Sequence, residues 1–316
     1  MFSFFPTPYP DELFYSIITR YHIRSGNKNF QQTLFELLGY SPQQLCNIEL
    51  PNNLIFLVKH LPIASRHSVQ SLICDHTLYP FYKSFLTQPE AFFLKEMLAK
   101  KANKPILKIA KISINEKRET RQFLKFCRQC LEQDIQRYGE AYWHCIHQVP
   151  GVLVCPIHSL ILQKSLVLLK EGYLDCHAAD LKNCLVEVDE IGYKESTLQQ
   201  LLAVAKDIIW LSSNDLNSKG LQWLRSRYKY YLVEKKFMKV PSSNTFKFDS
   251  QKFADAIFDF YGQEFWNVVK PGLGTHAERY FTHCLLACDI VPAIDRVTHI
   301  ILIRFLSNSP KDFFKR

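Results

Sequence analysis

The cysteines and histidines of this 316-residue chain contain one pattern with a clear chemical meaning. Cys127 and Cys130 form a CxxC pair, and 24 residues later Cys155 and His158 form a CxxH pair. Each short turn presents two ligands from adjacent positions, and two such turns can close around one tetrahedral zinc ion. Four unrelated side chains are the alternative, since free cysteine is often buried. The paired spacing favours a single structural zinc.

Two further groups of Cys and His residues lie near this pattern but lack its spacing. They are Cys176, His177 and Cys184, and His144, Cys145 and His147. A second metal therefore stays open against ordinary buried cysteines and hydrogen-bonded histidines.

The formal charge of +9 is unevenly spread along the chain. Residues 95–128 carry eleven Lys/Arg against three acids, and residues 219–252 carry nine against two. Two basic tracts on a mildly acidic remainder suggest double-stranded DNA or another polyanion as partner. The alternative is two solvated helix faces.

In the second tract aromatic residues alternate with cations, so a helix over 221–237 could turn Trp223, Tyr230 and Phe237 inward and its cations toward phosphates. The residues expected to contact DNA are Lys219, Arg225, Arg227, Lys229, Lys235, Lys236, Lys239 and Lys247.

The composition places the chain among globular proteins, with 47% apolar residues and no apolar run long enough to cross a bilayer. Its start, MFSFFPTPYPDELF, lacks a basic region and cleavage site typical of signal peptides. Ten cysteines without secretion favour thiolate–metal chemistry in a reducing cytoplasm over disulfides.

Apolar spacing predicts a mainly α protein of several helical modules. A first helix over 11–25 should turn Leu13, Phe14, Ile17, Ile18 and Tyr21 to one face and end at Gly26. Further helices are expected over 30–38, 51–60, 65–74, 221–237, 249–261, 276–286 and 297–306, and one from Ser196 with a stripe of Leu198, Leu201, Leu202, Ala205 and Ile209. The segment KPILKIAKISI alternates enough to be a strand.

These elements divide into three expected regions: an N-terminal helical module (1–94), a basic segment with a zinc-ribbon-type module (95–190), and a helix-turn-helix-like DNA-binding region (191–316). The gap between the two ligand pairs is twice that of a two-histidine finger. Reading of DNA by one finger helix is therefore not implied.

Three segments, PTPYPDELFYSIITRY, RHSVQSLICDHTLYPFY and FCRQCLEQDIQRYGEAYWHCIHQVPGVLVCPIHSLIL, closely resemble the TniQ/TnsD family of transposon target-selection proteins. The resemblance spans most of residues 4–165, and THIILIRFLSNSPKDFF adds a weaker match. The CxxC pair, RYGEAYWH and QVPGVLVCPIH occur together in the family's order.

This resemblance implies a non-enzymatic protein of the bacterial cytoplasm and nucleoid. A TnsD-type member binds an attachment site and recruits the AAA+ ATPase TnsC, which brings in the transposase. Other members of the family bind a CRISPR RNA-guided complex. The lack of a clear second CxxC pair after His158 favours the TnsD branch. On family grounds the N-terminal helices would face the ATPase, with Tyr9, Glu12, Leu13 and Arg20 shaping that module or serving its core.

An enzyme is the remaining class. Four protein ligands would leave zinc no open position for water. GLGTH at 272–276 lacks the Lys and Ser/Thr of a phosphate-binding loop, so ATP hydrolysis would belong to a partner.

Overall fold

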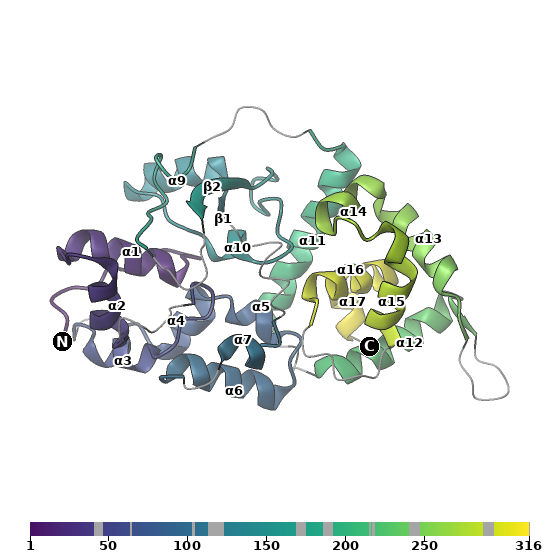
Figure 1. Ribbon diagram of the computed structural model, residues 1–316, viewed down its shortest axis with the longest axis horizontal. Helices are drawn as coiled ribbons and strands as arrows, with labels where there is room; N and C mark the ends of the chain where they lie inside the picture. Colours follow the sequence, from purple (N-terminus) through teal and green to yellow (C-terminus); the bar gives the residue numbers. More distant parts are fainter. Residues whose placement is uncertain are drawn as a thin grey trace.

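The computed structural model describes residues 1–40, 47–63, 65–102, 105–112, 123–168, 175–185, 192–214, 216, 219–239, 247–286 and 294–315. Helices make up most of these residues, which confirms the mainly α class. The N-terminal helices and the segment around residues 123–168 form one half of the molecule, the C-terminal helices form the other, and α11 (Glu195–Ser213) lies between them (Figure 1).

Among the described residues, seven helices precede the cysteine pattern. They are α1 (Phe14–Ser25), α2 (Phe30–Leu38), α3 (Leu54–His60), α4 (Val69–His76), α5 (Tyr79–Lys83), α6 (Gln88–Ala99) and α7 (Ile106–Ile109). Gly26 ends α1 at φ 73°, a left-handed conformation that glycine adopts without strain. Ser68 and Thr87 begin α4 and α6 with capping boxes.

α1 is more central than its sequence indicated. Its expected apolar face is buried, but so are Tyr15, Ser16, Thr19 and Arg20 on the other sides. The side chains of Tyr15 and Ser16 make hydrogen bonds with residues more than 100 positions away, which no local periodicity can reveal. α1 is therefore a core helix with a second, polar interface.

The segment KPILKIAKISI begins as the short helix α7, so the strand interpretation is wrong for residues 106–109. Ile106, Ala110 and Ile112 are buried, and the end of the segment lies outside the described residues. Alternation of apolar side chains over so few residues fits both a strand and a helical turn.

The middle of the chain is built on one antiparallel pair of strands. It consists of β1 (Phe123–Phe126), α9 (Arg128–Tyr138), α10 (Cys145–Gln148) and β2 (Gln163–Leu168). In the β1–β2 register, Phe126 lies opposite Gln163 and Lys125 opposite Lys164. The CxxC turn therefore leaves the end of β1, and the CxxH turn leads to the neighbouring start of β2.

After α11 the chain continues through α12 (Gly220–Glu234), β3 (Met238–Lys239), β4 (Lys247–Phe248), α13 (Ser250–Tyr261), α14 (Gln263–Val269), the 3-10 turn η1 (Gly274–His276), α15 (Ala277–Leu286), α16 (Arg296–Ser307) and α17 (Pro310–Lys315). β3 and β4 pair as a short antiparallel hairpin. Asp249 and Asp295 cap α13 and α16 through their side chains.

Two expected helix faces need correction. The buried stripe of α11 is Leu201, Val204, Ala205, Ile208 and Leu211, whereas Leu198, Leu202 and Ile209 are only half-buried. On α12 the inward residues are Leu224, Tyr228, Tyr231 and Leu232. Trp223 is half-buried, Tyr230 is exposed, and Phe237 is buried but lies beyond the helix end. The positions of the aromatic residues alone therefore did not predict which face of α12 packs against the core.

The two halves of the molecule are joined through the interior. Arg296 at the start of α16 is fully buried and donates hydrogen bonds to the carbonyl oxygens of Tyr82 and Ala110, at 3.2 and 2.5 Å. The expected boundary between residues 94 and 95 falls inside α6, and that between 190 and 191 lies outside the described residues. Within the described ranges, no helix has the length and apolar character needed to span a membrane.

Gly151 allows a test of the packing between residues 123–168 and the C-terminal helices. Its φ is +83°, and a Cβ there would lie 2.9 Å from the methyl carbons of Val297 on α16. Gly139 has a similar φ of +79° but open space around it. Both alanine variants bear left-handed strain of roughly 1 to 2 kcal/mol. We expect Gly151→Ala to cost roughly 1 to 3 kcal/mol more than Gly139→Ala, because only it overpacks the interface.

The free energy of unfolding from urea titration, compared between the two variants, checks this prediction. Equal losses would mean that the Gly151–Val297 contact relaxes without cost.

Candidate metal centre

The CxxC pair is positioned by the junction of a strand and a helix. Cys127 follows β1 directly and is the N-cap residue of α9, and Cys130 lies in the first turn of that helix. The amide of Leu131 donates to the carbonyl of Cys127 at 3.0 Å, which starts the helix. The exposed fractions of Cys127 and Cys130 are 1% and 4%, so both thiols face the interior.

The CxxH pair lies on a tight turn that returns the chain toward β2. The amide of Cys155 donates to the carbonyl of Leu160 at 2.7 Å, and the amide of Ser159 donates to the carbonyl of Cys155 at 2.8 Å. Ser159 adopts φ 58°, which closes the turn. Cys155 is fully buried and His158 is half-buried.

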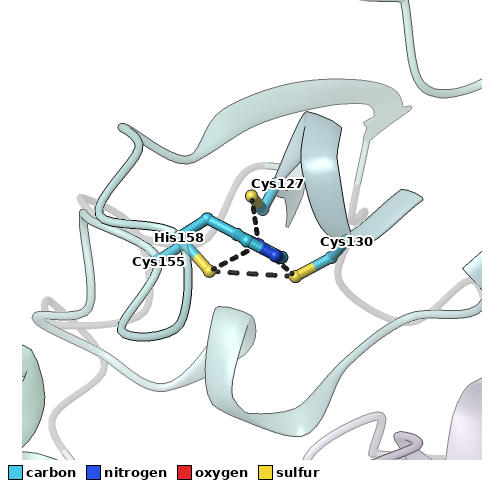
Figure 2. Close-up of side chains that lie close together, drawn as sticks. All are labelled: Cys127, Cys130, Cys155 and His158. Atoms are coloured by element: carbon cyan, nitrogen blue, oxygen red, sulfur yellow. Dashed lines mark hydrogen bonds between the residues drawn. The ribbon is translucent and has the colours of Figure 1, made fainter. Parts of the chain in front are cut away.

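The four side chains converge on one point, as Figure 2 shows. His158 Nδ1 lies 3.5, 3.3 and 3.7 Å from the sulfurs of Cys127, Cys130 and Cys155. The sulfurs of Cys130 and Cys155 are 3.8 Å apart. All four ligand atoms lie within 4.8 Å of one another.

These distances fit tetrahedral zinc. Zn–S bonds of about 2.3 Å and Zn–N bonds of about 2.0 Å imply ligand–ligand edges of about 3.5 to 3.8 Å. The separations involving His158 and the Cys130–Cys155 separation are close to these edges. Three thiols and one imidazole are also the donors that zinc prefers in structural sites.

The thiols compete for one negative charge. Hydrogen bonds with Cys127 and Cys130 lower the pKa of the Cys155 thiol, whereas hydrogen bonds with Cys127 and Cys155 raise the pKa of the Cys130 thiol. Three buried sulfurs this close cannot all carry a charge by themselves. A divalent cation removes the conflict, because it stabilises every thiolate that coordinates it.

The other cysteines and histidines near the pattern have different partners. Cys176 Sγ lies 3.9 Å from the carbonyl of Thr19, and the backbone of His177 accepts a hydrogen bond from Trp143. Cys145 and Cys184 are buried. In the part of the chain that the structure describes, only the Cys127–His158 group has metal-site geometry, so no second metal is assigned there.

His144 joins residues 123–168, which we call the metal segment, to the N-terminal residues. Its Nε2 lies 2.8 Å from Asp134 Oδ2 on α9, and its Nδ1 lies 3.5 Å from Asp11 Oδ2. Burial opposes a charge on this ring, but the hydrogen bonds to Asp11 and Asp134 outweigh it and raise the pKa of His144 to about 9. The backbone adds a bond from the amide of Cys145 to the carbonyl of Asp11 at 2.7 Å.

The residues expected to shape the ATPase-facing module form a buried network. Arg20 donates to Glu12 at 2.8 Å and to Glu140 at 2.9 Å, and its guanidinium lies 3.8 Å above the ring of Tyr9. Burial raises the pKa of Glu12 to about 7 against the effect of Arg20. Leu13 and Glu12 are fully buried, so neither side chain is available for direct contact with a partner.

The expected DNA-contacting residues separate into two groups. Arg227 is half-buried, donates to the carbonyl of Phe313 at 3.0 Å, and lies within 6 Å of the rings of Trp223 and Tyr231, so it helps to hold α17. Arg225 is half-buried as well. The exposed members are Lys219, Lys229, Lys235, Lys236, Lys239 and Lys247. The structure therefore brings the lysines, and not the arginines, to the surface.

Sequence reasoning missed two residues around the metal segment, Asp11 and Glu140. Glu140 accepts from Arg20, Arg24 and Tyr9, which lie more than 110 positions earlier in the chain. No spacing rule links residues so distant, and only the acidic residue within RYGEAYWH offered a signal.

A family model described as TniQ matches residues 3–162, half of the chain, and the match includes all four ligand positions. The chain belongs to the TniQ family. It is also similar to the transposon Tn7 transposition protein TnsD of Escherichia coli, with 32% identity over 161 residues. These residues are 50% of this chain and 31% of TnsD, so this member of the TniQ family aligns with about a third of that relative's length.

Replacing one ligand tests the zinc assignment. Cys130→Ser should remove the metal and lower the melting temperature, because the binding free energy of a structural zinc is part of the folding free energy. Metal analysis and thermal unfolding of the protein purified without chelators check both effects.

Cys145→Ala is the matched control, since Cys145 is equally buried but is not a ligand. It should retain zinc. A parent without zinc, or a Cys130→Ser variant that melts like the parent, contradicts the assignment.

Proposed function

We propose that this TniQ-family protein is a target-selection protein of a transposon. In this proposal it binds double-stranded DNA at an attachment site through its C-terminal half and recruits a TnsC-like AAA+ ATPase, which in turn brings in the transposase. The Cys127–His158 group holds one structural zinc. The protein itself carries out no catalytic step, because four protein ligands leave zinc no position for a water nucleophile.

Family membership and the name of the similar TnsD protein support a role in transposition. The observation that carries the DNA-binding part is the lysine-rich surface of the β3–β4 hairpin. Lys239 and Lys247 lie directly opposite each other in its register, and both are exposed. Like charges across a strand pair destabilise it. An anion bound over the pair would remove that repulsion.

The end of α12 adds two more cations beside the hairpin. Lys235 and Lys236 are exposed, and Lys252 lies close enough to donate to the carbonyl of Lys236 at 3.3 Å. Among the described residues, no carboxylate lies within ion-pair distance of Lys235, Lys236, Lys239 or Lys247. We refer to these four residues as the hairpin lysines.

The first basic tract contrasts with the hairpin lysines. Lys100 pairs with Glu96 at 2.5 Å and Lys111 with Glu90 at 2.7 Å. Lys125 donates to the carbonyl of Val152 at 2.7 Å. These three cations already have partners within the fold.

The distribution of charge supports a division of labour. Residues 1–94 carry six basic and six acidic residues, whereas residues 219–252 carry nine and two. The N-terminal helices therefore have little to attract DNA, and they present exposed apolar side chains such as Ile23 on α1 and Phe35 on α2. We assign ATPase docking to this module, with Tyr9, Glu12, Leu13 and Arg20 maintaining its shape.

The second candidate function is an adaptor that links a CRISPR RNA-guided complex to the ATPase. Family resemblance supports it, and the hairpin lysines would then contact guide RNA or the complex. Duplex binding by the isolated chain distinguishes the two functions, since a guided adaptor needs no DNA affinity of its own.

The hairpin lysines should bind phosphates of the duplex. Changing Lys235, Lys239 and Lys247 to Gln should weaken duplex binding, and the slope of log affinity against log salt should fall by about 0.9 for each phosphate that is no longer neutralised. Fluorescence anisotropy with a duplex at several salt concentrations measures both quantities. These positions are preferred to Arg225 and Arg227, whose replacement would disturb packing.

The matched control changes three exposed lysines of the N-terminal helices and their vicinity, Lys28, Lys59 and Lys101, to Gln. It removes the same charge and should keep the parent's slope. If both triple variants behave alike, the effect is one of net charge and the hairpin is not the DNA-binding surface.

Docking of the ATPase should depend on the N-terminal surface and not on the hairpin. Ile23→Ser with Phe35→Ser should reduce capture of the ATPase on beads that carry DNA and the protein, while duplex affinity stays at the parent's value. Removal of whole helices is unsuitable because α1 lies in the core.

Phe260→Ser on α13 replaces another exposed aromatic residue and serves as the control. Undiminished capture by the Ile23/Phe35 variant would place the docking surface elsewhere.

A further inference from the structure

His147 lies against the metal centre without being one of its ligands. It is 1% exposed, and its Nε2 is 3.7 Å from Cys130 Sγ. The compact set of ligand atoms includes His158 and not His147. A buried ring nitrogen at this distance from a sulfur is in position for a hydrogen bond.

Contacts of α10 hold this ring beside the CxxC pair. Gln148, the next residue of α10, exchanges hydrogen bonds with the backbone of Lys125 on β1, at 3.0 and 2.8 Å. On its other side His147 lies against the ring of His144, with 4.8 Å between the ring centres. α10 is thus tied to the strand that leads to Cys127 and to the His144–Asp134 pair.

The chemistry of the site calls for such a donor. Three thiolates and one neutral imidazole around Zn²⁺ leave a net charge of −1 in a buried place. A neutral histidine carries one N–H group, and a hydrogen bond from it to a thiolate spreads part of that charge. Partners of this kind orient metal ligands and tune their affinity.

We propose that His147 is a positioning residue of the metal centre, whose Nε2–H donates a hydrogen bond to the Cys130 thiolate and so strengthens zinc binding. The inference rests on the zinc assignment made above. It adds a role for a residue outside the CxxC and CxxH pairs, and it connects the metal to His144 and thereby to Asp11.

The unmodified protein provides the first test. After loading with ¹¹³Cd, an NMR experiment on histidine-labelled protein should show His147 with its proton on Nε2 and a scalar coupling from that proton to the metal through Cys130 Sγ. A proton on Nδ1, or an Nε2 proton without coupling to a bound metal, overturns the proposal. Absence of bound metal would instead refute the zinc assignment.

Variants provide the second test. His147→Leu removes the donor and should release zinc to a chelator about tenfold to a hundredfold more readily, with a shifted thiolate-to-metal band after Co²⁺ loading. His147→Gln retains an amide donor and should restore most of the parent's retention and spectrum.

His299→Leu is the matched control, because His299 is also buried and hydrogen-bonded, to Tyr228 at 2.9 Å, but lies away from the metal. It should lower stability without changing the Co²⁺ spectrum. A folded His147→Leu variant with the parent's spectrum and zinc retention overturns the proposal, and if this variant does not fold, the ¹¹³Cd measurement decides.

Discussion

The fold around residues 123–168 depends on closing two turns that are far apart in sequence. Strands of four and six residues, paired only with each other, are too small to be stable alone. Three thiolates buried together carry an electrostatic penalty unless a cation neutralises their charge. A metal bound by both turns would resolve these two difficulties together, since it would cross-link the strand ends and neutralise the buried thiolates.

The N-terminal residues are anchored to that segment through charge as well as packing. Asp11 contacts His144, and Arg20 bridges Glu12 and Glu140. A buried arginine with two carboxylates is tolerated because each charge has a partner, and it specifies one arrangement of the chain more sharply than apolar contact would. The residues at the interface of α1 and the metal segment therefore determine how these two parts are arranged. This is why side chains that the family resemblance associated with a docking module prove to be interior ones.

Local patterns predicted what depends on local physics. The convergence of Cys127, Cys130, Cys155 and His158 followed from CxxC and CxxH spacing, and the end of α1 followed from Gly26. Helix faces were predicted less well, because α1 and α11 bury residues against elements that periodicity cannot identify. Surface and interior cations also looked alike in sequence. Arg227 and the hairpin lysines belong to one basic tract, yet Arg227 packs against the aromatic ring of Phe313 while the lysines remain exposed. A guanidinium stacks on rings more readily than an ammonium gives up its water, so the difference has a physical origin.

A continuous line of packed residues connects the metal segment to the hairpin. Gly151 lies against Val297 at the start of α16, and at the other end of this helix Phe305 contacts Phe237, with 6.0 Å between the ring centres. Phe237 directly precedes β3 and also lies edge-on to Phe253 on α13. The hairpin is therefore held by the same helix that packs on the metal segment. Protein interiors are densely packed and resist small displacements. The metal segment, α16 and the base of the hairpin are therefore joined by contacts within one packed interior, and a substitution at Gly151 or Phe237 would be felt on both sides of α16.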